Sequence, residues 1–458
     1  MITKTILASQ TGARLDSHVH TGGGTDDTRV LQEALDRAAT DGGVRLVMDG
    51  AALVTALRVH SNTTIECLNP HCGFFQVAHS DTALLINAHP SAGAIIDCNI
   101  TLLGGTYNQN CANQAHHVPP DVHYSKAERL VVALAFFGVE NLLVRDVTVR
   151  DQRTFAFLIT NWQRVIMENI RLELPGYIPS GNQDGIHLQG PGRFLVLRNI
   201  QGRTGDDFIA LNGDEETNGQ RSWAHPCATV GPITDVLIDT VMVDDAAQVV
   251  RILSRESLHD RITIRNVSGN YRSFGFYLSA WDYRAKGLQG NFGAIQIENV
   301  DLRQTRADYT YTEPFLFRIS GRHRSLTLRN IQYHDPADDR YIVQLEGRTD
   351  VPEMGDTPAD VASLVIDGLH VLDSGEATQR RPYIKVSGRV RHLVVRNSEI
   401  LCAKNKQPVL VATEGPLAAV DHLHLHNVSA KNIGSLIQDP EGKIKRTDVG
   451  NAAFQPPA

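Results

Sequence analysis

The chain has 458 residues, of which 42% are hydrophobic and 21% charged, an ordinary composition for a globular protein. Its net charge of −7 argues against nucleic acid or an anionic membrane surface as a partner. No stretch reaches the roughly 18 apolar residues that cross a bilayer, and residues 1–10 lack the apolar run of a signal peptide. The default expectation is therefore a cytoplasmic protein, or a secreted one if a leader has been trimmed away.

Residues 1–50 are predicted to form an N-terminal cap. Val30, Leu31, Ala34, Leu35 and Ala38 recur at helical spacing behind a polar segment at 26–28, and the pair of glycines at 42–43 ends the pattern. A strand is expected at 44–47. The six cysteines form no repeated metal-binding pattern, so we interpret them as free thiols, several of them buried.

One short unit repeats from residue 51 to about residue 438. In each copy, apolar residues alternate around an Asn or Asp, and successive copies lie 23 to 40 residues apart. The repeated positions are Asp146, Asn169, Asn199, Asp239, Asn266, Asn299, Asn330, Asp367, Asn397 and Asn427. A period of 20–50 residues indicates a solenoid. The segments 111–126 and 214–226 interrupt the pattern and are predicted to be loops.

A second alternating run lies between most of these copies. The middle residues of these runs form one column in register, namely His187, Ala210, Arg251, Tyr277, Arg318, Gln344 and Lys385. Their neighbours are apolar, so the column should face outward. Coils of two or three short strands predict an all-β fold, a parallel β-helix with a short N-terminal capping helix. We expect a right-handed coil, because right-handed crossovers dominate parallel sheets. Residues 51–438 would form the β-helix, and the polar residues 439–458 a C-terminal tail.

Three carboxylates lie together in the predicted stack. Asp184 precedes the run at His187 by three residues, as Asp207 precedes the run at Ala210, and Asp206 lies beside Asp207. Rungs of a sheet are about 4.8 Å apart, so this crowding should raise the pKa of at least one carboxyl. One protonated and one ionised carboxyl are the equipment of glycosidic bond cleavage.

Simpler interpretations exist for each residue. A single Asp at a turn is usually structural, but three acids at one edge favour a catalytic site. His187 could equally be a surface imidazole, and Arg251 could be an ion-pair partner instead of a substrate ligand. Arg318 and Lys385 lie too many rungs away for the chemistry and are expected on a solvated face.

These motifs resemble the polygalacturonase-type glycoside hydrolases of family 28, within the pectate-lyase-like superfamily. Asn182-Gln183-Asp184-Gly185 resembles the Asn-Thr-Asp-Gly motif of that family, and Gly205-Asp206-Asp207 matches its Gly-Asp-Asp. The segment at Arg251 resembles its Arg-Ile-Lys motif, and Trp162 lies where many members carry tryptophan. The resemblance implies an inverting hydrolase in which Asp207 is the general acid and Asp184 and Asp206 activate water.

Two motifs depart from that family. Leu253 replaces the expected lysine, and no Gly-His-Gly follows the acids, so that His225 or His187 would have to substitute. The lack of a signal peptide favours a small oligosaccharide substrate and exo action. Predicted substrate-binding residues are His187, Arg251, His225, Tyr277 and Trp281, with Trp223 and Tyr283 as further stacking candidates.

Two other classes of protein fit the same fold. A polysaccharide lyase or uronate epimerase would need a base and often Ca²⁺, and a non-catalytic glycan-binding β-helix would need none of the acids. No cofactor and no metal are expected for the hydrolase, and the sequence leaves a homo-oligomer open.

Overall fold

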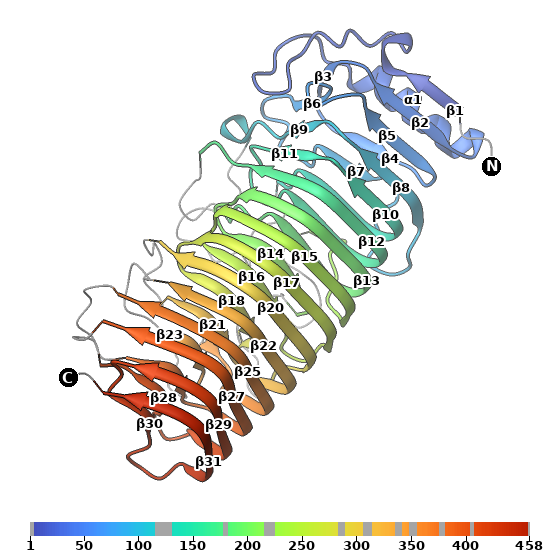
Figure 1. Cartoon of the computed structure of the whole chain (residues 1–458). Coiled ribbons are helices and arrows are strands. Elements are labelled where there is room, and N and C mark those ends of the chain that lie inside the picture. The colour runs from blue at the N-terminus through green and yellow to red at the C-terminus, as the bar shows by residue number, and fades with distance from the viewer. Residues whose placement is uncertain are drawn as a thin grey trace. The chain divides into compact units, whose positions relative to one another are not determined.

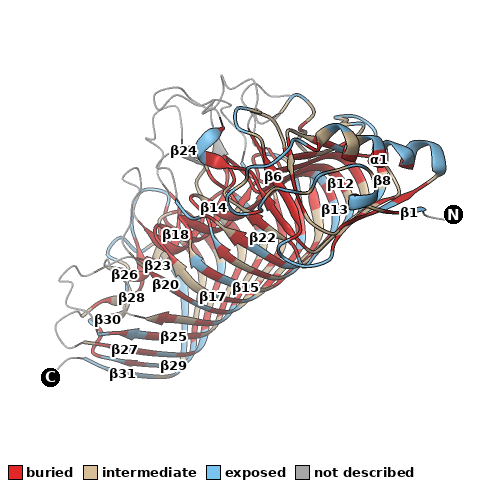
Figure 2. Cartoon of the chain, turned by 90° about the horizontal axis from the view of Figure 1, so that it is seen from above, coloured by how far each residue is buried: buried red, intermediate tan, exposed pale blue. Residues whose placement is uncertain are grey.

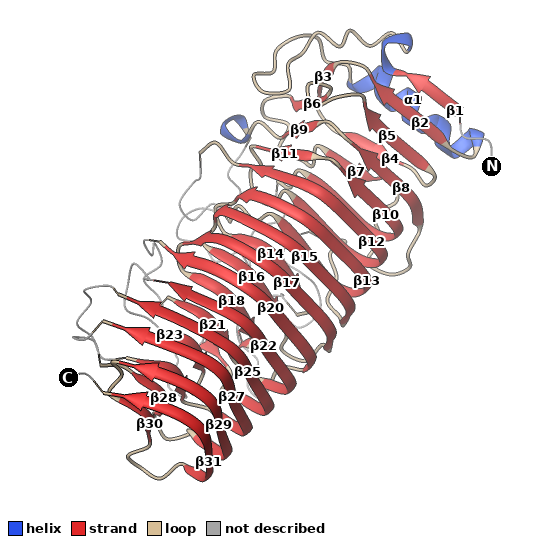
Figure 3. Ribbon diagram, in the orientation of Figure 1, coloured by secondary structure: helices blue, strands red, loops and turns tan. Residues whose placement is uncertain are grey.

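The computed structural model describes residues 4–114, 131–176, 182–214, 225–282, 289–305, 314–334, 341–347, 355–374, 381–403 and 407–456. The chain divides into two compact units, residues 1–236 and 237–458, and each is described by itself. Both are built of stacked parallel strands (Figure 1, Figure 3). No helix in the described part of the chain has the length and apolar character that crossing a bilayer requires.

Unit 1 contains one α-helix and the first fourteen strands of the described chain, β1 to β14. Helix α1 is Thr28–Asp41, and the short 3-10 helices η1 and η2 are Ala8–Gln10 and Cys111–Asn113. The strands are β1 (Lys4–Leu7), β2 (Val44–Met48), β3 (Ala51–Val54), β4 (Leu57–Val59), β5 (Thr63–Cys67), β6 (Gly73–Gln76), β7 (Leu85–Asn87), β8 (Asp97–Leu103), β9 (Thr106–Asn108), β10 (Leu134–Arg145), β11 (Thr148–Arg150), β12 (Phe157–Glu173), β13 (Ile186–Arg203) and β14 (Asp207–Asn212).

Strands that follow one another after a full turn lie side by side in unit 1. One parallel sheet runs β1–β2–β5–β8–β10–β12–β13, and a second runs β3–β6–β9–β11–β12. A third runs β4–β7–β10. Helix α1 buries Leu31, Ala34, Leu35 and Ala38 and ends at Gly42, whose φ of 83° is the left-handed conformation that glycine adopts most readily. The predicted helix is therefore confirmed.

Unit 2 alternates short and long strands. Its elements are β15 (Ile233–Asp245, which begins in unit 1), β16 (Gln248–Leu253), β17 (His259–Tyr271), β18 (Phe274–Ser279), β19 (Trp281–Asp282), β20 (Phe292–Gln304), β21 (Phe315–Ile319), β22 (Arg322–His334), β23 (Tyr341–Leu345), β24 (Gly355–Asp356), β25 (Asp360–Asp373), β26 (Pro382–Val386), β27 (Arg389–Cys402), β28 (Val409–Thr413), β29 (Ala419–Lys431), β30 (Ser435–Gln438) and β31 (Ile444–Gln455). The short strands stack as β16–β18–β21–β23–β26–β28–β30 and the long ones as β17–β20–β22–β25–β27–β29–β31.

The alternation in the sequence becomes columns of apolar side chains inside the coil. In unit 2 one column consists of buried residues from six successive long strands, namely Ile262, Ile295, Leu326, Leu364, Leu393 and Leu423. Burying each such side chain contributes about 1.5–3 kcal/mol. Figure 2 shows the strands largely in the buried class. The predicted parallel β-helix is confirmed, whereas its handedness stays a prediction.

The repeated Asn residues form hydrogen-bonded ladders on the outside of the coil. In unit 2, Asn266 Nδ2 donates to Asp239, Asn299 to Asn266, and Asn330 to Asn299, at 2.7–2.9 Å. Unit 1 has similar ladders, such as Asn199 to Asn169 to Asp146. The asparagines adopt φ of 51–58°, where Asn is tolerated better than most residues. The Asn positions mark the corner of each coil.

Replacing Asn299 tests the ladder. Asn299→Ala removes one donated and one accepted hydrogen bond and forces a Cβ-bearing residue without a polar group into φ 56°. We expect a loss of about 2 kcal/mol in the free energy of unfolding, measured by urea denaturation. Asn299→Gly loses the same bonds but relieves the backbone, so it should cost about half as much. Equal losses for the two variants would contradict the conformational part of this argument.

The C-terminal residues continue the coil instead of forming a tail. Strand β31 lies within 439–458 and pairs in parallel with β29, from Val420 with Ile444 to Lys431 with Gln455. Its side chains are mostly exposed because no further described strand stacks on it. Residues 439–458 are polar because they include the last described rung, whose side chains are mostly exposed. At the other end, β2 lies within the predicted cap and pairs with β5.

Candidate active site

Asp184 and Asp207 lie at equivalent positions of adjacent rungs in unit 1. The start of β13 pairs with β14, with Ile186 beside Ile209 and His187 beside Ala210. The backbone N–H of Gly185 donates to the carbonyl oxygen of Asp207 at 2.8 Å, which extends this register back to the two acids. Adjacent rungs are about 4.8 Å apart, so the two acids occupy equivalent backbone positions one rung apart. The predicted pairing of the two runs is confirmed.

Asp184 is held by a buried histidine. His187 Nδ1 lies 2.6 Å from Asp184 Oδ2, and both side chains are at most 3% exposed. The imidazole stacks on Phe155, with ring centroids 4.2 Å apart and planes 8° from parallel. Asn212 Nδ2 lies 3.0 Å from His187 Nε2, and Gln189 Nε2 lies 3.4 Å from it. The ring is therefore fixed in position and in plane, and it in turn fixes the Asp184 carboxylate.

The alternation that places His187 on the outer face explains these neighbours. Strand β12 pairs Thr160 with Gln189, and β14 adds Asn212 to the same column, so two amides stand beside the imidazole. Sequence reasoning did not single out Phe155 or Asn212. The register itself carried the signal for Asn212, because Asn212 follows Ala210 as Gln189 follows His187.

Gly185 allows the close approach of the rung that carries Asp207. A Cβ built on Gly185 would lie 2.5 Å from the carbonyl oxygen of Phe208 and 2.6 Å from Leu172 Cδ1. Any larger residue would push the Asp184 segment away from β14. Steric packing in this fold therefore explains why a glycine follows Asp184, without any appeal to a related family.

Asp206 is the most accessible of the three acids. Its side chain is partly exposed, while Asp184 and Asp207 are each 2% exposed. Its N–H donates to the carbonyl of Gln183 at 3.1 Å, and its own carbonyl accepts the Thr204 hydroxyl at 2.9 Å. The Gln183 side-chain amide lies 3.5 Å from Cys111 Sγ, whose pKa is raised by burial to about 11. That thiol is thus neutral near physiological pH.

His225 lies over an apolar cluster on the outer face. Its ring stacks on Phe137, with centroids 4.3 Å apart. The cluster consists of Val132, Ala135, Phe137, Phe155, Leu158 and Ala228, with Cys227 packed against it. Phe137 belongs to the column of Thr160, Gln189 and Asn212, three rungs before Asn212. His187 therefore lies beside Asp184, whereas the part that His225 plays in the site stays a prediction.

Trp162 positions the strand that carries His187. Its indole N–H donates to the carbonyl of Gln189 at 3.1 Å, and the ring is 2% exposed. A Cβ on Gly192 would lie 2.1 Å from the indole, so the absence of a side chain at Gly192 leaves room for the Trp162 ring. The tryptophan noted in the sequence has a packing role here.

The remaining predicted site residues belong to unit 2. Arg251 pairs in register with Tyr277, and Tyr277 with Arg318, as the column predicted. Tyr277 is 1% exposed and packs with Phe274 and Phe315. Trp281 forms part of β19.

Two further findings bear on the sequence-based expectations in and near unit 2. Trp223 and Tyr283 lie outside the described residues. Leu253, where the resemblance expects a lysine, is fully buried. Arg318 was expected on a solvated face. This is wrong, because Arg318 is 1% exposed and forms an ion pair with Glu346, which is equally buried.

No protein-family model matches the chain. A polygalacturonase of Persea americana is 28% identical over 202 residues, 42% of this chain and 41% of that protein, so the chain spans about two-fifths of the length of this curated relative.

Two solved structures share the fold over 98% of this chain. A family 28 exopolygalacturonase of Yersinia enterocolitica has 14% identity and a TM-score of 0.55, with 78% of that protein covered. The N-terminal fragment of gene product 12 of bacteriophage Phi29 has 17% identity and a TM-score of 0.56, with 66% covered. At these identities the two structures speak for the fold alone.

Fold and site together define a parallel β-helix that carries a carboxylate cluster at one edge of its coils. The sequence match adds a closer relation. Over 202 of its residues the chain is a homologue of polygalacturonases, and its fold is a parallel β-helix. The resemblance inferred from the Asp-Gly and Gly-Asp-Asp motifs is confirmed.

Proposed function

We propose that the protein is a glycoside hydrolase that cleaves a pectic oligosaccharide through Asp184, Asp206 and Asp207. The observation that carries the proposal is the placement of Asp184 and Asp207 at equivalent positions of adjacent rungs, with Asp206 beside them. Two carboxyl groups on one face can divide the work of hydrolysis, since one protonates the leaving oxygen while the other activates water. Homology to polygalacturonases supports a uronate-containing substrate.

The roles follow from the matched motifs. Asp207 acts as general acid on the glycosidic oxygen, and Asp184 and Asp206 orient and deprotonate the attacking water. His187 is a positioning residue, because it holds the carboxylate of Asp184 through Nδ1 while Phe155 and Asn212 fix its ring. The reaction inverts the anomeric centre, as the resemblance implies. Exo action belongs to the proposal as predicted from the sequence, and the product analysis below tests it.

Substrate recognition differs from the expected basic pair. Leu253 cannot bind a carboxylate, since it is an apolar side chain buried in the coil. Arg251 is partly exposed and is left as the predicted uronate ligand from that motif. A single guanidinium can still bind a carboxylate through two parallel hydrogen bonds.

The test is a product analysis with the full chain. Oligogalacturonides and neutral oligosaccharides are incubated with enzyme in EDTA, and the products are followed by reducing-end assay and NMR. The hydrolase proposal predicts saturated monosaccharide from one chain end, with the initial anomer opposite to that of the cleaved bond. An unsaturated product would mean a lyase, an altered C5 centre an epimerase, and binding without turnover a glycan-binding protein.

A further inference from the structure

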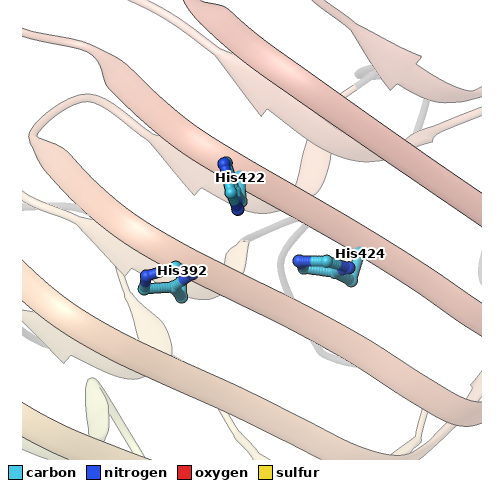
Figure 4. A group of neighbouring side chains, drawn as sticks. All are labelled: His392, His422 and His424. Carbon is cyan, nitrogen blue, oxygen red and sulfur yellow. The ribbon is translucent and has the colours of Figure 1, made fainter.

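Three histidines come together on the last coils of unit 2. His392 on β27 and His422 and His424 on β29 each offer one ring nitrogen, and these nitrogens all lie within 4.8 Å of one another. Figure 4 shows the three imidazoles on neighbouring strands. His392 is exposed, whereas His422 and His424 are half-buried. This cluster belongs to no motif of the carboxylate site.

The register of the sheet produces the triangle. His392 pairs directly with His422 across the ladder, and His424 follows His422 by two residues on the same face. Cross-strand neighbours are about 4.8 Å apart, so His422 has one imidazole across the ladder and one along its strand. The rings of His392 and His422 are 5.2 Å apart, and those of His422 and His424 are 5.9 Å apart. The strand register therefore fixes the relative positions of the three Cα atoms.

An acidic residue on the next strand lies beside one member. His424 Nδ1 lies 3.3 Å from Asp448 Oδ2, because β31 pairs His424 with Asp448. A carboxylate at Nδ1 holds the proton on that nitrogen and leaves Nε2 as a metal ligand, the arrangement that accompanies most metal-bound histidines. Arg446 pairs in register with His422 and brings a positive charge to the cluster, and its Nε lies 3.6 Å from the same carboxylate. Asp448 therefore offsets the charge that would otherwise disfavour a cation.

We propose that His392, His422 and His424 bind one divalent transition-metal ion of the Zn²⁺ class. Three imidazoles are the donor set of Zn²⁺ sites with an open fourth position, whereas Ca²⁺ and Mg²⁺ take oxygen ligands. Ligands 2.0–2.1 Å from a tetrahedral ion lie about 3.4 Å apart, so the rings move inward by about 1 Å. Side chains with solvent access can make that adjustment by rotation. Asp448 supports the site from behind His424.

Binding would connect the last rungs of unit 2. The ion would join β27 to β29, and Asp448 would extend the link to β31, a strand whose side chains are mostly exposed. Because the unfolded chain does not hold the three rings together, the ion stabilises the folded state. The proposal is independent of the hydrolase activity, which should persist in EDTA.

The experiment titrates the EDTA-treated full chain with ZnCl₂ by calorimetry, with CoCl₂ by visible absorption and with CaCl₂ as a reference. We expect one equivalent of Zn²⁺, a tetrahedral Co²⁺ spectrum, no Ca²⁺ binding and a melting temperature several degrees higher with Zn²⁺. His422→Ala should lower Zn²⁺ affinity at least tenfold and remove the melting shift. Asp448→Asn should weaken binding about 10- to 100-fold.

His426→Ala is the matched control. His426 lies two residues beyond His424 on the same face of β29 but outside the cluster, so its replacement should leave Zn²⁺ binding unchanged. His392→Asn provides a second variant on the other strand, should His422→Ala fold poorly. The proposal is overturned if wild type binds no stoichiometric Zn²⁺, or if His422→Ala and His392→Asn bind it as tightly as His426→Ala.

Discussion

Asp207→Asn is expected to lower the rate of glycoside cleavage about 10²- to 10⁴-fold, the range that one general acid contributes. The change is nearly isosteric, so substrate should still bind while protonation of the leaving oxygen is lost. Initial rates on an oligogalacturonide measure the effect. A substrate whose leaving group needs no protonation should recover much of the loss in Asp207→Asn but little in Asp184→Asn, because Asp184 acts on water. Equal recovery in both variants would contradict the assignment of the general acid to Asp207 and of water activation to Asp184.

Asp146→Asn is the control for this change. Asp146 is an exposed residue of unit 1 whose Oδ1 accepts the Asn169 amide at 2.7 Å, and an asparagine oxygen can accept the same bond. Its φ of 58° also suits asparagine. Activity should therefore remain at the wild-type level. A comparable loss in Asp146→Asn would show that the chemical change itself perturbs the coil, and the Asp207 result would carry no weight.

The repeat and the register could be predicted because both rest on local chemistry. Alternating apolar residues have one way to face the interior of a coil, and Asn is among the few residues that tolerate a left-handed corner. Once His187 was aligned with Ala210, the pairing of Asp184 with Asp207 followed by counting. The same counting placed Tyr277 beside Arg318 and Gln344 beside Lys385.

The contacts that cover the outer face of the coil could not be predicted from the repeat. Outward residues were expected to meet solvent, yet His187 is 1% exposed, stacked on Phe155 from an earlier coil. The stacking of His225 on Phe137 was not predicted either, because segment 225–228 packs on an apolar cluster that no repeat describes. Such contacts join residues far apart in sequence and outside the period, so periodicity holds no signal for them.

Glu346→Ala is expected to destabilise the protein by about 3–5 kcal/mol, the effect of removing one partner of a buried ion pair. Glu346 and Arg318 form an ion pair with both side chains at most 2% exposed, and Glu346 Oε1 also accepts the Gly347 N–H at 2.9 Å. The Arg318 guanidinium lies 5.4 Å from the Tyr277 ring centroid and 5.6 Å from that of Phe315. Without Glu346 the buried guanidinium loses this carboxylate partner while it stays beside the two aromatic rings. Urea denaturation measures the loss.

A double variant separates the loss of the ion pair from the effect of leaving one buried charge without its partner. Replacing both partners with apolar residues, as Arg318→Met with Glu346→Leu, removes the buried charges together and should recover most of the stability that Glu346→Ala loses. Glu441→Ala breaks an exposed pair with Lys443, 3.2 Å apart, and should cost less than about 1 kcal/mol. If Glu346→Ala costs no more than Glu441→Ala, water reaches Arg318. If the double variant is as unstable as Glu346→Ala, packing and not the uncompensated charge sets the loss.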